Sequence, residues 1–371
     1  MPVYSRTSKF LHHMALNYPA LCELQFDVER QLKRGSLAPS KDGSHVFVCG
    51  LARAGTTVLM RSIYESREFS SLTYRDMPFV LAPNIWSTMQ RGSQRSMEEE
   101  ERAHGDGLLV DFDSPEALEE VFWRLFCGED YLLDDRLVPH EVDDETTEKL
   151  RDYVSMITLR HERSRYLSKN NNNILRIGAI RTAFPDARVL IPFRDPVEQA
   201  RSLLSQHQRF LEAHQTDAFT RKYMTWLAHH EFGSDHRPFH FVERSLSSNE
   251  PSNISYWLDR WNDSYSFLLD RYEDGNSSIK FVCYEDMCAD DASTWRNLCD
   301  FLELPFTTPS AFRKKTASSD LKPINIDTNP YYETYERARS ATTMTSSVLA
   351  SRIVSPANRF LPASRKSFDQ R

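Results

Sequence analysis

Apolar and polar residues follow one another along the chain in a pattern that predicts strand–helix units. Apolar residues recur at helical spacing from 8 to 34, and the stretch 35–44 that follows has the composition of a linker. From 45 to 51 the chain is short, continuously apolar and rich in β-branched residues, which favours a strand buried on both faces of a parallel sheet. Helical character follows from 56 to 66.

The same alternation recurs twice further along the chain. Residues 188–194 are strand-like, although Pro192 weakens the assignment to a central strand. Asp195 and Pro196 then have the residue types of an N-cap and a first helical position, and the helix is expected to reach about 212. A third strand at 279–284 precedes a helix at about 292–302. Repeated units of this kind predict a doubly wound α/β domain with its ligand at the carboxyl ends of the strands.

The pattern also divides the chain into segments. We expect an N-terminal helix and linker at 1–44, one α/β domain at 45–341, and a Ser- and Arg-rich, poorly ordered tail at 342–371. Within the domain, a mostly helical insertion is predicted at about 84–170, with one helix starting at Ser114-Pro115.

Composition and charge narrow the functional classes. The 371 residues are 40% hydrophobic, which is globular, and 46 basic against 53 acidic residues give a formal net charge of −7. This balance argues against a nucleic-acid partner, and no apolar run has membrane-spanning length or the form of a signal peptide. We therefore expect a cytoplasmic protein without membrane insertion. The six cysteines form no CxxC pair, so neither a zinc site nor a disulfide framework is expected, and no motif defines an oligomeric state.

The segment from Gly50 to Thr57 carries the clearest chemistry. Its two glycines have the spacing of a P-loop, and it lies between a predicted strand and a predicted helix whose N-terminal amides would face an anion. Thr56 occupies the place of the Walker lysine, which argues against an ATPase that uses magnesium, while Arg53 supplies a cation earlier in the loop. A plain strand-to-helix turn is the alternative interpretation.

At this point the chain resembles the sulfotransferases that use 3′-phosphoadenosine 5′-phosphosulfate (PAPS), and in particular the bacterial carbohydrate sulfotransferases. Arg-Ala-Gly-Thr-Thr at 53–57 is similar to the arginine form of their 5′-phosphosulfate loop, except that Ala52 stands where proline is usual. The resemblance implies a P-loop-like fold and donor binding by Arg53, Ala54, Gly55, Thr56 and Thr57.

Two further segments extend the resemblance over about 45–315. Arg194 and Ser202 match, in type and spacing, the arginine and serine that bind the donor's 3′-phosphate in the family, and Ser202 is expected to face back toward Arg194. Residues 281–287 and 295–305 are similar to a late strand and helix of the family, where Tyr284 and Glu285 are interpreted as structural. The basic segment Arg313, Lys314 and Lys315 is a candidate loop that closes over the donor's phosphates; a solvated basic turn is the alternative.

The resemblance implies transfer of a sulfuryl group from PAPS to a hydroxyl, with PAP as product and no metal. Arg53 and the loop amides would stabilise the charge that develops on the leaving phosphate. Lys169 is a possible second cation, or an exposed lysine at the end of a helix.

A base for the acceptor hydroxyl is the remaining requirement. Asp76 lies just beyond the first helix, where related enzymes carry a carboxylate, and Arg75 beside it is a candidate acceptor contact. A salt-bridged structural role for Asp76 is the alternative. His104 competes as base, and the polar turn that contains His104 and Asp106 is equally an acceptor-binding candidate.

The resemblance favours a saccharide as the hydroxyl-bearing acceptor. Tyr74, Phe79 and Trp86 follow the loop and have side chains that stack on sugar rings, or that fill a core. Two rival functions are a P-loop small-molecule kinase and a non-catalytic nucleotide-binding protein of the same fold.

Overall fold

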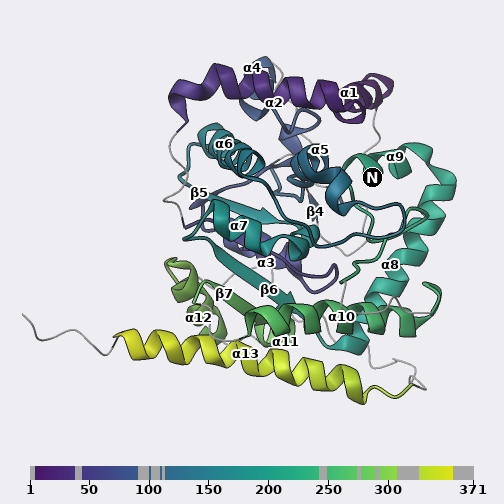
Figure 1. Ribbon diagram of the computed structural model, residues 1–371, viewed down its shortest axis with the longest axis vertical. Coiled ribbons are helices and arrows are strands. Elements are labelled where there is room, and N and C mark those ends of the chain that lie inside the picture. Colours follow the sequence, from purple (N-terminus) through teal and green to yellow (C-terminus); the bar gives the residue numbers. More distant parts are fainter. Residues whose placement is uncertain are drawn as a thin grey trace, which may run out of the picture.

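A five-stranded, all-parallel sheet forms the centre of the protein, and helices lie on both of its faces (Figure 1). The computed structural model describes residues 5–37, 44–90, 100–101, 109–110, 113–241, 249–273, 277–289, 292–306 and 326–353. The strand order is β2-β5-β1-β6-β7. Their bounds are Val46–Val48 (β1), Phe69–Ser70 (β2), Arg165–Lys169 (β5), Arg188–Phe193 (β6) and Ile279–Cys283 (β7). The predicted doubly wound α/β fold is confirmed.

The apolar runs explain the centre of this sheet. All three residues of β1 are fully buried, and Val46 pairs with Leu167 of β5 on one side and Arg188 of β6 on the other. Burying each large apolar side chain contributes about 1.5–3 kcal/mol. Pro192 lies inside β6 and pairs with Val282 of β7, so the doubt about a central strand at 188–194 was wrong.

The helices that follow these strands agree with the pattern. They are α3 (Thr56–Tyr64), α8 (Pro196–Thr216) and α12 (Ala292–Leu302). Asp195 caps α8, since its Oδ1 accepts a hydrogen bond of 2.9 Å from the amide of Glu198, which confirms its predicted role. The other helices on the carboxyl half are α7 (Ile177–Ala183), α9 (Ala218–Trp226), α10 (Ile254–Tyr272) and α11 (Tyr284–Cys288).

The stretch expected to be a helical insertion contains one strand of the central sheet. It holds α4 (Pro83–Gln90), α5 (Glu120–Tyr131), α6 (Asp144–His161) and a small antiparallel pair, β3 (Glu100–Glu101) and β4 (Leu109–Val110). It ends, however, in β5, which pairs directly with β1. The sequence pattern missed β5 because arginine and lysine stand at its two ends.

The helix expected to start at Ser114-Pro115 begins later, at Glu120. Pro115 forms a bridge with Thr73, and the amide of Tyr74 donates to the carbonyl of Ser114. These pairings hold the chain extended before α5.

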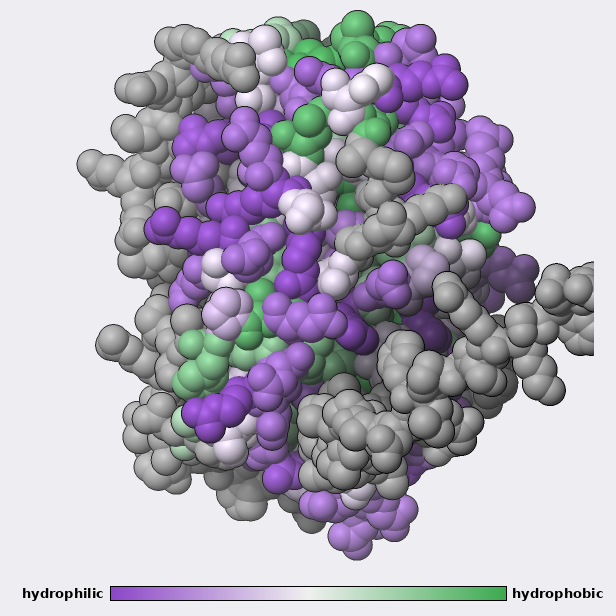
Figure 2. All heavy atoms as spheres, turned by 90° about the vertical axis from the view of Figure 1, so that its left-hand side faces the viewer, coloured by the Kyte–Doolittle hydropathy of each residue, from purple (hydrophilic) through white to green (hydrophobic). Residues whose placement is uncertain are grey.

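Two helices replace the single N-terminal one that was expected, α1 (Arg6–Asn17) and α2 (Pro19–Lys33). The break falls at Tyr18, whose extended backbone precedes Pro19. Leu24, Val28 and Leu32 of α2 and Met89 of α4 are exposed. Figure 2, which views the molecule from the left-hand side of Figure 1, shows apolar residues near the top of that face.

The last helix, α13 (Asn329–Ile353), packs against β7 and α10 and runs along one side of the molecule (Figure 1). Its backbone crosses position 342, where the tail was expected to begin, and 354–371 lie outside the described residues. No helix in the described ranges is both long and apolar enough to cross a membrane. All six cysteines are free.

Candidate active site

The segment between β1 and α3, residues 50–57, forms a tight turn that we call the phosphate loop. Gly55 is the N-cap of α3 and has φ +83°, and a Cβ at this position would lie 2.4 Å from Cδ2 of Tyr284. Only glycine satisfies both constraints. Arg53 also has a positive φ, 69°, which a non-glycine residue adopts at a cost of about 1–3 kcal/mol. Such strain is typical of functional sites.

The start of α3 is suited to an anion. The first amides of a helix have no intrahelical acceptor, and Gly55 has no side chain with which to cap them. Thr56 and Thr57 are the first two residues of the helix, so their amides and the helix dipole favour a bound phosphate at this point.

A hydrogen bond joins the two motifs that the sequence singled out. Arg53 Nε donates to Oγ of Ser202 across 3.0 Å, although the two residues are 149 positions apart in the chain. Arg194 follows β6; its guanidinium lies 3.4 Å from Glu198, 4.0 Å from Glu285 and 5.1 Å from the ring of Tyr284. The phosphate loop, Ser202 and Arg194 thus gather at the carboxyl ends of neighbouring strands. Ser202 therefore contacts the phosphate loop through Arg53.

A buried glutamine, which the sequence did not single out, fixes the loop where the family has proline. Gln199 is fully buried on α8, and its Nε2 donates to the carbonyl of Ala52 across 2.9 Å. Trp261 of α10 donates to the other end of the same amide at 3.0 Å. These two bonds hold the backbone at Ala52 in place.

Tyr284 and Glu285 have the structural contacts that were expected of them. Tyr284 covers Gly55, and Glu285 accepts a hydrogen bond of 3.0 Å from the amide of Asp195 and one of 3.2 Å from Tyr335. These bonds connect the beginning of α8 to α11 and α13.

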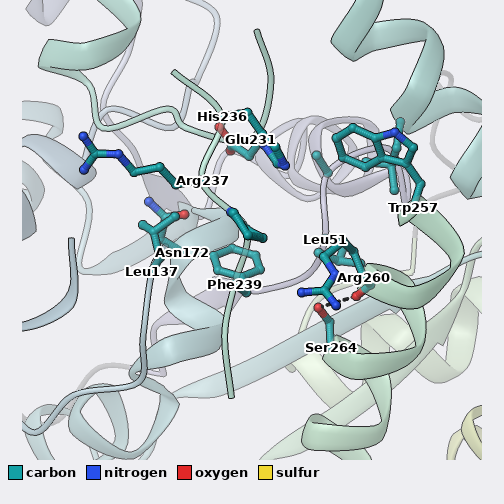
Figure 3. A pocket seen from close by; sticks show the side chains of 13 residues that line it. Leu51, Leu137, Asn172, Glu231, His236, Arg237, Phe239, Trp257, Arg260 and Ser264 are labelled. Carbon is teal, nitrogen blue, oxygen red and sulfur yellow. Dashed lines mark hydrogen bonds between the residues drawn. The ribbon is translucent and has the colours of Figure 1, made fainter. Parts of the chain in front are cut away.

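A cavity lies beside the phosphate loop, and Figure 3 shows its walls. The phosphate loop itself forms part of the lining. The lining residues are Leu51, Ala52, Leu137, Asn172, Leu203, Glu231, His236, Arg237, Pro238, Phe239, Trp257, Arg260 and Ser264.

Asp76 is not among the residues that line the cavity. Its exposed fraction is 0%, and its Oδ2 accepts hydrogen bonds from the amide (2.8 Å) and hydroxyl (3.1 Å) of Thr73, which caps the short 3-10 helix at Tyr74–Asp76. Arg160 and His161 lie 3.7 and 3.6 Å from its oxygens. Arg75 forms a two-bond ion pair with Asp113. These contacts agree with the structural alternative for Asp76.

The aromatic candidates follow Asp76. Trp86 donates to the carbonyl of Arg75 at 3.2 Å and packs on Phe79, whereas Tyr74 donates to Glu116 at 2.8 Å. None of the three is among the residues that line the cavity. His104, Asp106, Arg313, Lys314 and Lys315 lie outside the described residues.

Lys169 ends β5 next to the phosphate loop. It pairs with Val48 of β1, the amide of Asn170 donates to the carbonyl of Val48 at 3.1 Å, and Lys169 is 8% exposed. The second cation suggested by the sequence is therefore a nearly buried lysine at the carboxyl edge of the sheet, and not an exposed one at a helix end.

The described residues contain no group of His, Cys, Asp or Glu side chains arranged to hold a metal ion. Fold and site together define a P-loop-like α/β protein whose helix start and arginines are suited to a phosphate-bearing ligand. Residues 45–242 match the profile of the sulfotransferase family, and the chain belongs to that family.

Solved sulfotransferases are similar to the chain at low sequence identity. STF1 from Mycobacterium tuberculosis is 13% identical, with a TM-score of 0.46 over 92% of this chain and 81% of that one. STF9 from Mycobacterium avium is 16% identical, with a TM-score of 0.44 over 95% and 87%. The sulfotransferase of Alicyclobacillus acidocaldarius is 15% identical, with a TM-score of 0.34 over 82% and 95%. No curated protein matches the chain.

Proposed function

We propose that the protein transfers a sulfuryl group from PAPS to a hydroxyl of a saccharide acceptor and releases PAP. The single observation that supports this most strongly is the hydrogen bond between Arg53 and Ser202. It brings a 5′-phosphosulfate-type loop together with the motif that carries a 3′-phosphate in the family. A ligand with phosphates at both positions fits this pair better than a triphosphate does.

The residues have separate parts in the proposed reaction. The amides of Thr56 and Thr57 and the guanidinium of Arg53 would hold the 5′-phosphate and stabilise the charge that develops on it as sulfuryl leaves. Arg194 and Ser202 would hold the 3′-phosphate, and Lys169 would add positive charge beside the loop. Ala54 and Gly55 shape the turn. Three further assignments remain predictions from the sequence. They are a cytoplasmic location, a closing loop formed by Arg313, Lys314 and Lys315, and acceptor contacts by His104 and Asp106.

Binding measurements separate this function from that of a kinase. We expect calorimetry to show saturable binding of PAP, and ATP with magnesium to bind at least about tenfold more weakly, since the loop has no Walker lysine. Transfer of ³⁵S from labelled PAPS to a set of methyl glycosides should continue in the presence of a strong chelator. Preference for ATP–magnesium, or full inhibition by the chelator, would favour the kinase instead.

A further inference from the structure

Among the described residues that line the cavity beside the phosphate loop, one is acidic, Glu231 (Figure 3). Leu51 and Ala52 bring the phosphate loop to its wall, and Asn172 comes from the segment that follows β5. Since β5 and β1 are neighbours, the cavity opens at the carboxyl edge of the sheet. This is the edge at which the sulfuryl group of a bound donor would be presented.

Glu231 belongs to a well-fixed segment, residues 229–240, which we call the 229–240 loop. The amides of Gly233 and Ser234 donate to ring nitrogens of His207 and His214 on α8, at 3.3 and 3.2 Å. Gly233 has φ +83°, and a Cβ there would lie 2.5 Å from the ring of His214. Close packing against α8 therefore positions the backbone next to Glu231.

Other elements hold the same loop from its second half. His236 Nε2 lies 2.8 Å from the hydroxyl of Tyr256 on α10. The amide of Leu137 donates to the carbonyl of Pro238, and the amide of His240 donates back to Leu137. Contacts from three separate segments thus fix the loop before any ligand binds.

The carboxylate of Glu231 is oriented and ionised. Asn171 donates to its Oε1 across 2.8 Å. Burial alone would raise the pKa of Glu231, but the charges of His229 and Lys169, together with the bond from Asn171, bring that pKa below its usual value. At neutral pH the group is a carboxylate and can accept a proton.

The remaining walls suit a ring that carries hydroxyl groups. Leu137, Phe239 and Trp257 give apolar and aromatic surface, and Asn172, Arg237 and Arg260 add polar groups. Mostly apolar walls with a few convergent polar groups are typical of small-molecule sites.

We propose that this cavity is the acceptor pocket and that Glu231 is the base for the acceptor hydroxyl. The proposal rests on the sulfotransferase function above. It assigns to Glu231 the role of general base that the sequence had suggested for Asp76. Asp76 is fully buried against Thr73 and is not part of the cavity, whereas Glu231 faces it.

The step balances with donor and acceptor alone. A carboxylate oxygen of Glu231 takes the hydroxyl proton while the acceptor oxygen forms a bond to sulfur. The bond between sulfur and the bridging phosphate oxygen breaks, and its electron pair stays on PAP. The products are a sulfate ester, PAP and protonated Glu231, which then loses its proton to solvent.

The test measures PAP release from PAPS in full-length protein, with water, 4-nitrophenol and a mixture of methyl glycosides as acceptors. Glu231→Gln keeps the shape and the bond to Asn171 but accepts no proton, so turnover should fall by about a hundredfold or more while PAP affinity stays the same. Glu231→Ala leaves room for an added carboxylate, and formate should restore part of its turnover. Asp235→Asn is the matched control, because Asp235 is on the same loop but pairs with Arg221.

The possible outcomes distinguish the two proposals. If wild-type protein binds no PAP, or releases none from PAPS with any acceptor, the proposed function fails and the role of Glu231 fails with it. If wild-type protein turns over and Glu231→Gln matches it, only the role of Glu231 is overturned. A loss in Glu231→Gln that Asp235→Asn shares, with no rescue of Glu231→Ala by formate, would mean that the loop acts through structure and would also overturn that role.

Discussion

The donor side and the acceptor side of the candidate site are built in different ways. The donor side comes from short continuous segments, a strand, a turn and a helix start at 46–57, and another at 188–202. The acceptor side is assembled from α8, α10, the segment after β5 and the 229–240 loop. There, a hydrogen bond from Asn171 positions the carboxylate of Glu231. Local geometry defines the first, whereas tertiary packing defines the second. Substitutions on the donor side should therefore affect ligand binding, and substitutions on the acceptor side should affect turnover or stability.

The largest effect is expected at Gly55. Gly55→Ala places a Cβ against the ring of Tyr284 at a backbone angle that alanine rarely adopts, so the phosphate loop must move. We expect PAP binding to weaken by about a hundredfold or more, because several charge-assisted bonds to one phosphate are lost together. Calorimetry measures this directly.

Gly178→Ala is the matched control for that change. Gly178 is in α7, and a Cβ there meets nothing within 4 Å, so the variant should bind PAP normally and gain about 0.5–1 kcal/mol of stability. Normal PAP binding by folded Gly55→Ala would show that the loop does not hold the ligand.

The next effect is on discrimination at the 3′-phosphate. Arg194→Ala should weaken PAP binding by about 1.5–3 kcal/mol, the usual contribution of a charged hydrogen bond, and should barely change binding of the analogue that lacks the 3′-phosphate. Arg188→Ala, at the opposite end of β6, removes a pair with Glu303 and should change neither. Equal losses for both ligands would remove Arg194 from the 3′-phosphate site.

A substitution at Asp76 tests which of two carboxylates, Asp76 or Glu231, is the base. Asp76→Asn removes a buried negative charge that accepts two bonds from Thr73 and lies near Arg160 and His161. We expect the free energy of unfolding to fall by about 1–3 kcal/mol, with turnover of the folded protein reduced only modestly. A hundredfold loss of turnover at unchanged stability would instead make Asp76 the base and exclude Glu231.

The contrast between the two sides also explains what the sequence could predict. The parallel sheet, the phosphate loop and the cap at Asp195 each depend on residues close together in the chain, so hydrophobic period and turn chemistry were sufficient. β5 was missed because its charged ends mask a buried strand. Gln199 and Glu231 were missed because their partners are distant in sequence, and a lone glutamine or glutamate has no local signature. The resemblance placed the base just after the first helix. In this chain the carboxylate at that position, Asp76, accepts hydrogen bonds from the amide and hydroxyl of Thr73.

The smallest effect concerns the pH dependence of stability, and it tests whether the 229–240 loop is packed as described. Burial, together with the charge of His207, lowers the pKa of His236 from 6.5 to about 4, and burial likewise lowers the pKa of His207, His214 and His230. An unfolded chain takes up protons on these groups near pH 6.5, whereas the folded protein takes them up only at lower pH. Their stabilising contribution is therefore fully present above pH 6.5 and is lost as the pH falls toward 4.

Between pH 7 and 5.5 we expect His236 alone to reduce the free energy of unfolding by about 1 kcal/mol, which a urea titration at each pH measures. His236→Gln removes that titration and should flatten the curve by this amount. A urea midpoint that stays constant from pH 7 to 5.5 would mean that the histidines are hydrated in solution, and that the loop presenting Glu231 is looser than its contacts with α8 and α10 indicate.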